Sequence, residues 1–218
     1  MSGRSEKLIR VINPNSNASV TENLSLSLEG LRLPNGPRID CVTFEDAPFG
    51  IESADHINQV IPMLEDAVIS DREADAFVIA CYSDPGLDAC RALTDRPVFG
   101  IQNAGVLTAM ALGRRFGVVA LSETSIKRHL VYLENMGVLS SLAAERPVDL
   151  SVADSGTPDA YARVAKAAVA LRDEDRADCL VLGCAGMSGH RTRLEHEIGL
   201  PVVDPTWAAV ALALGAVK

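Results

Sequence analysis

The segments ADAFVIAC at residues 74–81 and ADCLVLGC at residues 177–184 share the pattern that decides the fold of this 218-residue chain. Each has an Ala-Asp pair, then a short apolar run, then a cysteine. Such runs, when turn residues bound them and helical patterns follow, are typical of buried parallel strands. The cysteines that close them, Cys81 and Cys184, are 103 residues apart.

A second pair of segments keeps nearly the same spacing. Pro97-Val98 and Pro201-Val202 are 104 residues apart, and each leads into an alanine-rich helical pattern. The stretch 10–15 also resembles 118–123, because each is an opening strand that runs into a polar turn. A spacing near half of the chain predicts a duplicated α/β unit, with chance similarity between two βα segments as the alternative.

The alternation of short apolar runs with longer helical patterns continues along the chain and predicts an α/β fold with parallel sheets. The expected strands are 8–12, 39–44, 76–80, 98–101, 117–121, 180–183 and 202–203. The expected helices are 18–31, 53–70, 85–92, 105–112, 125–136, 159–172, 190–197 and 206–214.

Composition and charge exclude several classes of function. The chain is 48% hydrophobic and 22% charged, as in ordinary globular proteins. Its net charge is −9 and it has no basic run, so no nucleic-acid partner is expected. The longest apolar segment, 207–217, is too short to span a bilayer, and residues 1–7 lack the apolar stretch of a signal peptide. We therefore expect a cytoplasmic protein without a membrane partner.

The five cysteines form no recognisable framework. An odd number in a cytosolic chain argues against disulfides, and neither C-x-x-C spacing nor a histidine cluster indicates a metal site. Each cysteine taken alone fits a buried apolar position. Cys81 and Cys184 differ from the rest, because each closes a predicted parallel strand, and ligands of open α/β sheets bind at such strand ends.

Both of these cysteines precede a predicted helix start. Asp84 is expected to be an N-cap and Pro85 the first helical residue after Cys81. Cys184 is followed by a glycine-rich turn with free backbone N–H groups. We therefore expect both positions to favour the thiolate.

Two thiols in equivalent positions suit a racemase, which removes a proton from one face of a carbon and returns one to the other. Backbone N–H groups beside each thiol would stabilise the enolate oxygen. Pyridoxal phosphate needs a lysine at the site, yet no lysine lies at a predicted strand end. Nucleotide-binding glycine motifs are also missing from the sequence. No cofactor is expected.

At these residues the chain resembles the hydantoin racemase branch of the aspartate/glutamate racemase superfamily. The segments that carry the resemblance are 11–16 (VINPNS), 50–53 (GIES), 80–86 (ACYSDPG), 112–116 (LGRRF) and 182–187 (LGCAGM). The resemblance implies two similar Rossmann-like α/β/α domains related by pseudo-twofold symmetry, with the active site in the cleft between them. It also implies a cofactor-independent two-base mechanism, a small-molecule substrate and a homo-oligomer. The domains would be 1–102 plus 205–218, and 103–204.

The resemblance makes Cys81 and Cys184 the catalytic pair. The substrate-binding candidates that it implies are Asn13, Pro14, Asn15, Ser16, Tyr82, Ser83, Ser122, Ser125, Ala185 and Gly186. Plain turn chemistry is the alternative for residues 13–15, and helix capping is the alternative for Ser122 and Ser125.

The expected substrate is a 5-substituted hydantoin or a similar cyclic ureide such as allantoin. Amino-acid racemases of the superfamily usually carry threonine after each cysteine, whereas Tyr82 and Ala185 stand there in this chain. Three positions also depart from the hydantoin and allantoin racemase pattern, after Cys81, near 102–103 and near 120–121. Related decarboxylases keep only the second cysteine, so Cys81 counts against that reaction. Amino-acid racemase, maleate isomerase and a non-catalytic ligand-binding module remain as alternatives.

Overall fold

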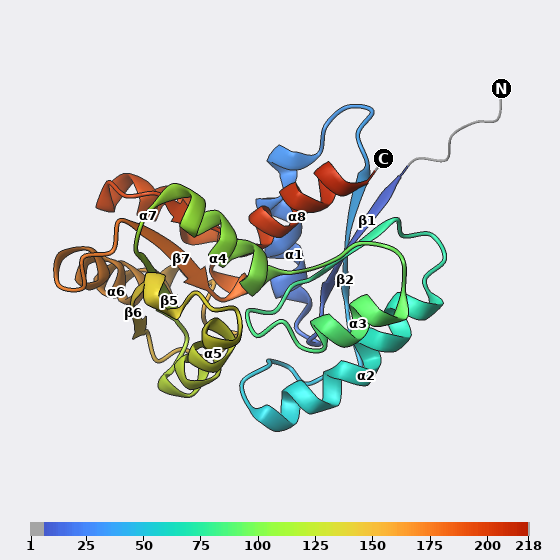
Figure 1. The fold of residues 1–218 in the computed structure, drawn as a ribbon, viewed down its shortest axis with the longest axis horizontal. Coiled ribbons are helices and arrows are strands. Elements are labelled where there is room, and N and C mark those ends of the chain that lie inside the picture. The colour runs from blue at the N-terminus through green and yellow to red at the C-terminus, as the bar shows by residue number, and fades with distance from the viewer. Residues whose placement is uncertain (1–6, 218) are drawn as a thin grey trace.

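The computed structural model describes residues 7–217 and contains two parallel four-stranded sheets (Figure 1). The residues before Lys7, on which the signal-peptide expectation depends, lie outside this range. The first sheet has the order β2-β1-β3-β4 and the second β6-β5-β7-β8. Their strands are β1 (Leu8–Asn13), β2 (Arg38–Thr43), β3 (Ala76–Ile79), β4 (Val98–Gly100), β5 (Phe116–Ala120), β6 (Leu142–Pro147), β7 (Cys179–Gly183) and β8 (Val202–Val203). The predicted α/β class is confirmed.

The strand registers repeat between the two sheets. Val78 lies beside Phe99 in the first sheet, and Val181 lies beside Val203 in the second, which reproduces the predicted spacings of 103 and 104 residues. The opening strands are related differently from the prediction. Ile12 pairs with Ile79 and Val119 pairs with Leu182, so Ile12 corresponds to Val119, one residue away from the expected match.

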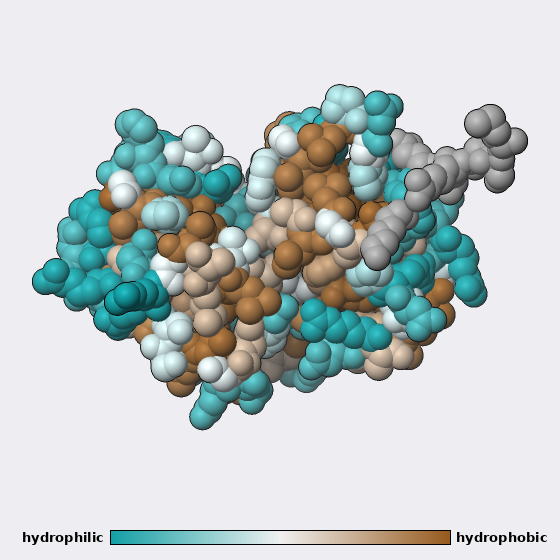
Figure 2. Space-filling model, turned by 45° about the horizontal axis from the view of Figure 1, so that its top comes forward, coloured by the Kyte–Doolittle hydropathy of each residue, from teal (hydrophilic) through white to brown (hydrophobic). Residues whose placement is uncertain are grey.

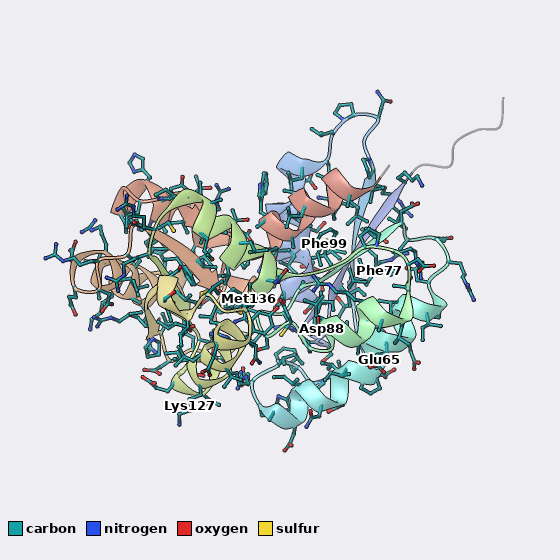
Figure 3. All side chains as sticks on the ribbon, viewed as in Figure 1. Glu65, Phe77, Asp88, Phe99, Lys127 and Met136 are labelled. Carbon is teal, nitrogen blue, oxygen red and sulfur yellow. The ribbon has the colours of Figure 1, made fainter. Side chains whose placement is uncertain are left out.

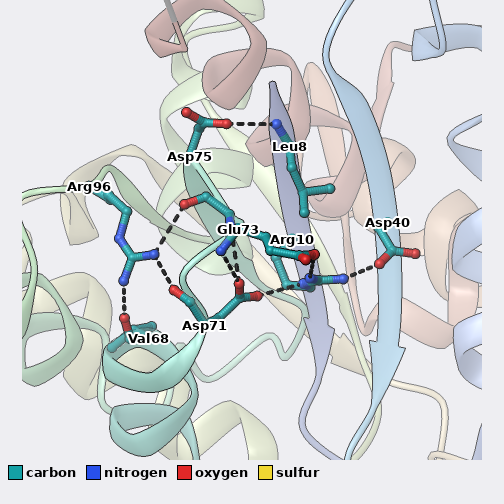
Figure 4. A network of polar contacts seen from close by, with 9 residues as sticks. Leu8, Arg10, Asp40, Val68, Asp71, Glu73, Asp75 and Arg96 are labelled. Atoms are coloured by element: carbon teal, nitrogen blue, oxygen red, sulfur yellow. Dashed lines mark hydrogen bonds and ion pairs between the residues drawn. The ribbon is translucent and has the colours of Figure 1, made fainter. Parts of the chain in front are cut away.

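The repeated Ala-Asp pair has a structural role at the amino ends of the sheets. The Asp75 carboxylate accepts a hydrogen bond from the Leu8 N–H (2.9 Å), and the Asp178 carboxylate accepts one from the Arg115 N–H (3.0 Å). Both aspartates thus tie the third strand of a half to the start of its first strand. In the first half, Arg10 extends this network by ion pairs to Asp40 and Asp71 (Figure 4).

Eight α-helices within residues 7–217 connect and cover the sheets. They are α1 (Ala18–Ser27), α2 (Ala54–Ser70), α3 (Leu87–Leu93), α4 (Ile101–Leu112), α5 (Glu123–Asn135), α6 (Tyr161–Asp173), α7 (Arg191–Ile198) and α8 (Pro205–Ala216). Helix α4 packs against β5, β7 and β8 of the second sheet, whereas α8 packs against β1, β3 and β4 of the first. The two helices also pack against each other (Figure 1). The expected division into 1–102 plus 205–218 and 103–204 stays a prediction.

Three local predictions are wrong. Strand β6 has no counterpart among the predicted strands, because every residue of Leu142–Pro147 is only half-buried and the segment shows no apolar run. Helix α4 begins at Ile101, directly after β4, rather than at residue 105. Helix α3 begins at Leu87, and its N-cap is Gly86 in the left-handed conformation (φ 65°), so Asp84 does not cap it.

Some apolar side chains of α4 and α8 lie on the surface. Leu107 and Leu112 of α4 and Leu212 of α8 are 44–54% exposed. Figure 2 shows hydrophobic residues over this part of the molecule. Among residues 7–217, no helix combines the length and the hydropathy that crossing a bilayer would need.

Candidate active site

The two predicted catalytic cysteines line one cavity between the two halves. Cys81 follows the carboxyl end of β3 by two residues, and Cys184 follows β7 directly. The cavity volume is about 40 Å³, which is room for a few water molecules. Six of the predicted substrate-binding residues also line it: Asn15, Tyr82, Ser83, Ser125, Ala185 and Gly186.

The other four candidates do not line this cavity. Asn13 is buried and donates to the Asn15 Oδ1 atom (3.0 Å) and to Thr21, so it holds the turn that presents Asn15. Pro14 and Ser16 belong to the same turn, and the Ser16 N–H donates to the Pro48 carbonyl (3.0 Å).

Ser122 and Ser125 form a reciprocal capping box at the start of α5. The Ser125 N–H donates to the Ser122 Oγ atom (3.2 Å), and the Ser122 N–H donates to the Ser125 Oγ atom (3.1 Å). Helix capping is therefore observed for both serines. Ser125 lines the cavity as well, whereas Ser122 does not.

The surroundings of Cys81 disfavour its thiolate, contrary to the expectation from sequence. Burial raises the pKa of Cys81 to about 12, and negative charge on Cys184 and Asp84 adds to this shift. The Ser83 N–H and the Arg128 guanidinium act in the opposite direction. The expected helix N-terminus does not help, because α3 begins only at Leu87.

Cys184 has more hydrogen-bond donors around its sulfur. The Ser155 Oγ atom lies 3.6 Å from the Cys184 Sγ atom, and the N–H groups of Gly186 and Met187 also point to the sulfur. These donors lower the pKa of Cys184, but burial raises it more, so the net shift is upward. Gly186 is needed for this approach, since a Cβ atom there would lie 2.3 Å from the Ser155 Oγ atom.

Asp84 caps a helix other than the predicted one. Its buried carboxylate accepts hydrogen bonds from the N–H groups of Gln102 (2.9 Å) and Asn103 (2.8 Å) in the first turn of α4. It also accepts one from the Tyr132 hydroxyl on α5 (2.8 Å), so it joins the two halves behind Cys81. Burial raises the pKa of Asp84 to about 6 despite these donors.

A buried aromatic and ionisable cluster supports the cavity wall beside Tyr82. The Tyr82 ring meets the His129 ring edge-on, with centroids 4.9 Å apart. The His129 Nδ1 atom lies 2.8 Å from the Glu145 carboxylate, and both side chains are almost fully buried. This pair fixes the orientation of an imidazole that itself lines the cavity.

Sequence reasoning missed His129, Arg128 and the apolar wall of the cavity. Arg128 and His129 follow Ser125 by three and four residues, so all three lie on one face of α5. That spacing was the available signal. The apolar wall comes from four separate elements, and its members are Val20, Ile51, Leu121 and Val152.

Contacts across the cavity join the loop before α2 to the second half. The Glu52 carboxylate accepts a hydrogen bond from the Val152 N–H (2.8 Å), and Arg128 donates to the Glu52 carbonyl (3.3 Å). Gly50 lies so close to Val152 that a Cβ atom at position 50 would be 2.9 Å from the Val152 Cβ atom. The cavity is therefore closed on this side by residues of both halves.

Comparison with known proteins agrees with this geometry. The family model for Asp/Glu/hydantoin racemase matches residues 9–213, which include both cavity thiols. The chain belongs to this racemase family. It is 35% identical to the hydantoin racemase of Paenarthrobacter aurescens, over 94% of this chain and 89% of the relative. It is 38% identical to the hydantoin racemase of Rhizobium meliloti, over 94% of this chain and 86% of the relative.

A solved structure of another family member shows the same architecture. The allantoin racemase from Klebsiella pneumoniae superposes with a TM-score of 0.90 at 29% identity, over 98% of this chain and 91% of that one. This member of the Asp/Glu/hydantoin racemase family is accordingly an isomerase, specifically a racemase.

Proposed function

We propose that this racemase interconverts the enantiomers of a 5-substituted hydantoin, or of a similar cyclic ureide such as allantoin, with Cys81 and Cys184 as the two bases. The observation that carries this proposal is that both thiols line one cavity at the carboxyl ends of equivalent strands. The curated relatives that are hydantoin racemases favour the same substrate class.

The chemistry requires one thiolate and one thiol. The thiolate takes the proton from C5 of the ring, and the electron pair of the broken C–H bond moves into the adjacent carbonyl to give an enolate. The other thiol then gives its proton to the opposite face of C5 and becomes the thiolate. The two thiols and the substrate supply and accept every proton and electron pair, so the proposed reaction needs no cofactor.

The raised pKa values of both thiols have a consequence for the rate. Because burial raises both pKa values, only a small fraction of the enzyme holds a thiolate at pH 7. At pH values below the pKa, each rise of one pH unit raises that fraction about tenfold. We therefore expect kcat/KM to increase between pH 7 and pH 9.

The cavity wall favours an apolar substituent at C5. Val20, Ile51, Leu121 and Val152 present hydrocarbon there, and burying an apolar group against them is favourable. Hydantoins with isopropyl or methylthioethyl groups are suitable first substrates.

Exchange of the C5 proton tests the reaction directly. Single enantiomers of several 5-substituted hydantoins are incubated with the enzyme in D₂O, and the C5–H signal is followed by NMR together with optical rotation. We expect both signals to decay together. If no hydantoin or allantoin exchanges while aspartate, glutamate or maleate reacts, the substrate class is wrong and another isomerase of the family is indicated.

Separate Cys81→Ser and Cys184→Ser variants test the two bases. Each is expected to lower racemisation at least 1,000-fold, because a serine hydroxyl is a far weaker base. Residual one-sided exchange on a single enantiomer is compatible with this assignment. Cys41→Ser is the matched control, since Cys41 is a free thiol on β2 that does not line the cavity. Normal racemisation by either active-site variant contradicts the assignment of that cysteine. Slow reaction of both thiols with iodoacetamide, together with no exchange of any substrate, would indicate a non-catalytic binding module.

We also propose that the enzyme is a cytoplasmic homo-oligomer without a nucleic-acid or membrane partner. Its five cysteines are free thiols, which suits a reducing compartment. The exposed leucines of α4 and α8 offer an apolar face to a second copy of the chain. Sedimentation of the purified protein tests the subunit number.

A further inference from the structure

Arg128 is a half-buried cation at the wall of the thiol cavity. Its Nη1 group donates long hydrogen bonds to the carbonyl oxygens of Glu52 and Thr124, both at 3.3 Å. Its Nε atom is buried and has no acceptor among residues 7–217. None of the ion pairs among the described residues includes Arg128.

A shielded guanidinium without a counter-ion is unfavourable, because it loses hydration without gaining an opposite charge. Burial indeed lowers the pKa of Arg128, and negative charge on Cys81 raises it. Other ionisable groups around the cavity are already engaged. Asp84 binds α4 and Tyr132, His129 and Glu145 pair with each other, and the Glu52 carboxylate binds the Val152 N–H.

The proposed reaction supplies the missing counter-charge. The site carries one negative charge at every stage of the proton transfers, first on one thiolate, then on the enolate oxygen, and finally on the other thiolate. A fixed cation beside the cavity stabilises that charge wherever it lies, and such an interaction is strong where water is excluded. An arginine also offers a planar set of donors that fits a carbonyl oxygen.

We propose that Arg128 is a further catalytic residue, whose guanidinium pairs with the negative charge on Cys81 and then donates through Nε to the enolate oxygen of the substrate. This inference rests on the proposed two-thiol reaction. It separates Arg128 from its exposed neighbour Lys127, which projects from the same helix at the outside of the molecule (Figure 3).

The experiment compares Arg128→Met with Lys127→Met, which removes a charge from the next position of α5 without changing the cavity wall. In Arg128→Met we expect kcat/KM at pH 7 to fall about 10- to 100-fold, because the thiolate and the enolate oxygen lose the cation that pairs with them. The fall should lie in kcat more than in KM and should be of similar size from pH 7 to pH 10, because the pKa of Cys81 lies above this range. Lys127→Met should stay within twofold of the wild type at every pH.

Arg128→Lys and thermal denaturation keep the test interpretable if Arg128→Met folds poorly. The lysine variant keeps the charge and should regain part of the neutral-pH activity, but not the donors of the planar guanidinium. A loss below threefold, or a loss that lies in KM alone, overturns the catalytic role of Arg128.

Alkylation of Cys81 gives a readout that does not depend on turnover. Iodoacetamide labelling, mapped to the Cys81 peptide by mass spectrometry at pH 8, should be about tenfold slower in Arg128→Met than in the wild type or in Lys127→Met. If the wild type exchanges no C5 proton, the proposed function fails, and slower labelling would still support the pairing of Arg128 with Cys81. Unchanged labelling refutes that pairing even in an active racemase.

Discussion

In each half of the molecule a carboxylate caps the helix that follows the fourth strand. The two carboxylates come from different positions in their halves. In the second half, Asp204 at the end of β8 caps α8 by accepting the N–H groups of Thr206 (2.8 Å) and Trp207 (3.2 Å). In the first half, Gly100 stands 104 residues before Asp204, and the cap of α4 comes from Asp84 after β3. A Cβ atom at Gly100 would lie 2.3 Å from the Asp84 carboxyl, so the two side chains would compete for one place.

This difference adds to the unequal surroundings of the two thiols. Moving the cap to Asp84 places a buried carboxylate three residues from Cys81, where its negative charge opposes the thiolate. Cys184 has the Ser155 hydroxyl and two backbone N–H groups in its surroundings, and the Glu52 carboxylate opposes its thiolate. A duplicated scaffold can therefore keep its helix caps while giving its two cysteines different acidities.

Gly100→Ala should have the largest effect of the substitutions that test the difference between the two helix caps. The new methyl group must displace the Asp84 carboxyl, which loses its hydrogen bonds to α4, and we expect the free energy of unfolding to fall by about 4 kcal/mol. Urea denaturation measures this change. Gly215→Ala in α8 is the control, because nothing lies within 4 Å of a Cβ atom there and alanine favours a helix.

A double variant shows whether Asp84 is the cause. Asp84 has a positive φ of 40°, so Asp84→Gly removes the carboxyl without adding backbone strain. In the Asp84→Gly background, Gly100→Ala should lower the free energy of unfolding by less than about 1 kcal/mol, because the carboxyl that the new methyl group would meet is absent. If Gly100→Ala lowers the free energy of unfolding equally in both backgrounds, a residue other than Asp84 leaves no room for a side chain at position 100.

The repeated strands could be predicted from sequence, whereas the parts of the site that come from distant segments could not. The apolar runs before Cys81 and Cys184 located β3 and β7, and the spacing of the two cysteines indicated the candidate site. Asp84 looked like a local cap, and its partners lie 18 and 19 residues further on, where no local rule applies. The edge strand β6 has no apolar period, because none of its residues is fully buried.

The pH dependence of stability also tests the two helix caps, because the capping carboxyls of Asp84 and Asp204 are both buried. Folding raises the pKa of Asp84 from 3.8 to about 6. Its stabilising contribution is therefore full below about pH 4 and is lost as the pH rises through 6. The stability advantage of the wild type over Asp84→Asn should shrink by up to about 3 kcal/mol between pH 4 and pH 7.

Urea denaturation at several pH values measures that difference. Burial also raises the pKa of Asp204, so Asp204→Asn should show a change of the same sign. A wild-type advantage over Asp84→Asn that grows with pH would contradict a raised pKa and would mean that the donors from α4 and α5 outweigh burial.

Ser155→Ala tests the difference in acidity between the two thiols, and we expect its effect to be the smallest of these. The Ser155 hydroxyl lies 2.8 Å from the Val152 carbonyl and 3.6 Å from the Cys184 sulfur. When Cys184 ionises, the hydroxyl proton can turn from the carbonyl to the sulfur, and such a hydrogen bond contributes about 1 kcal/mol. Iodoacetamide should therefore label Cys184 about fivefold more slowly at pH 8 in Ser155→Ala.

Cys81 serves as the internal control in the same sample, since no Ser155 contact reaches its sulfur. Its labelling rate should not change. If both thiols slow equally, the substitution has altered access to the cavity and not the acidity of Cys184. If neither slows, the two backbone N–H groups are sufficient for Cys184.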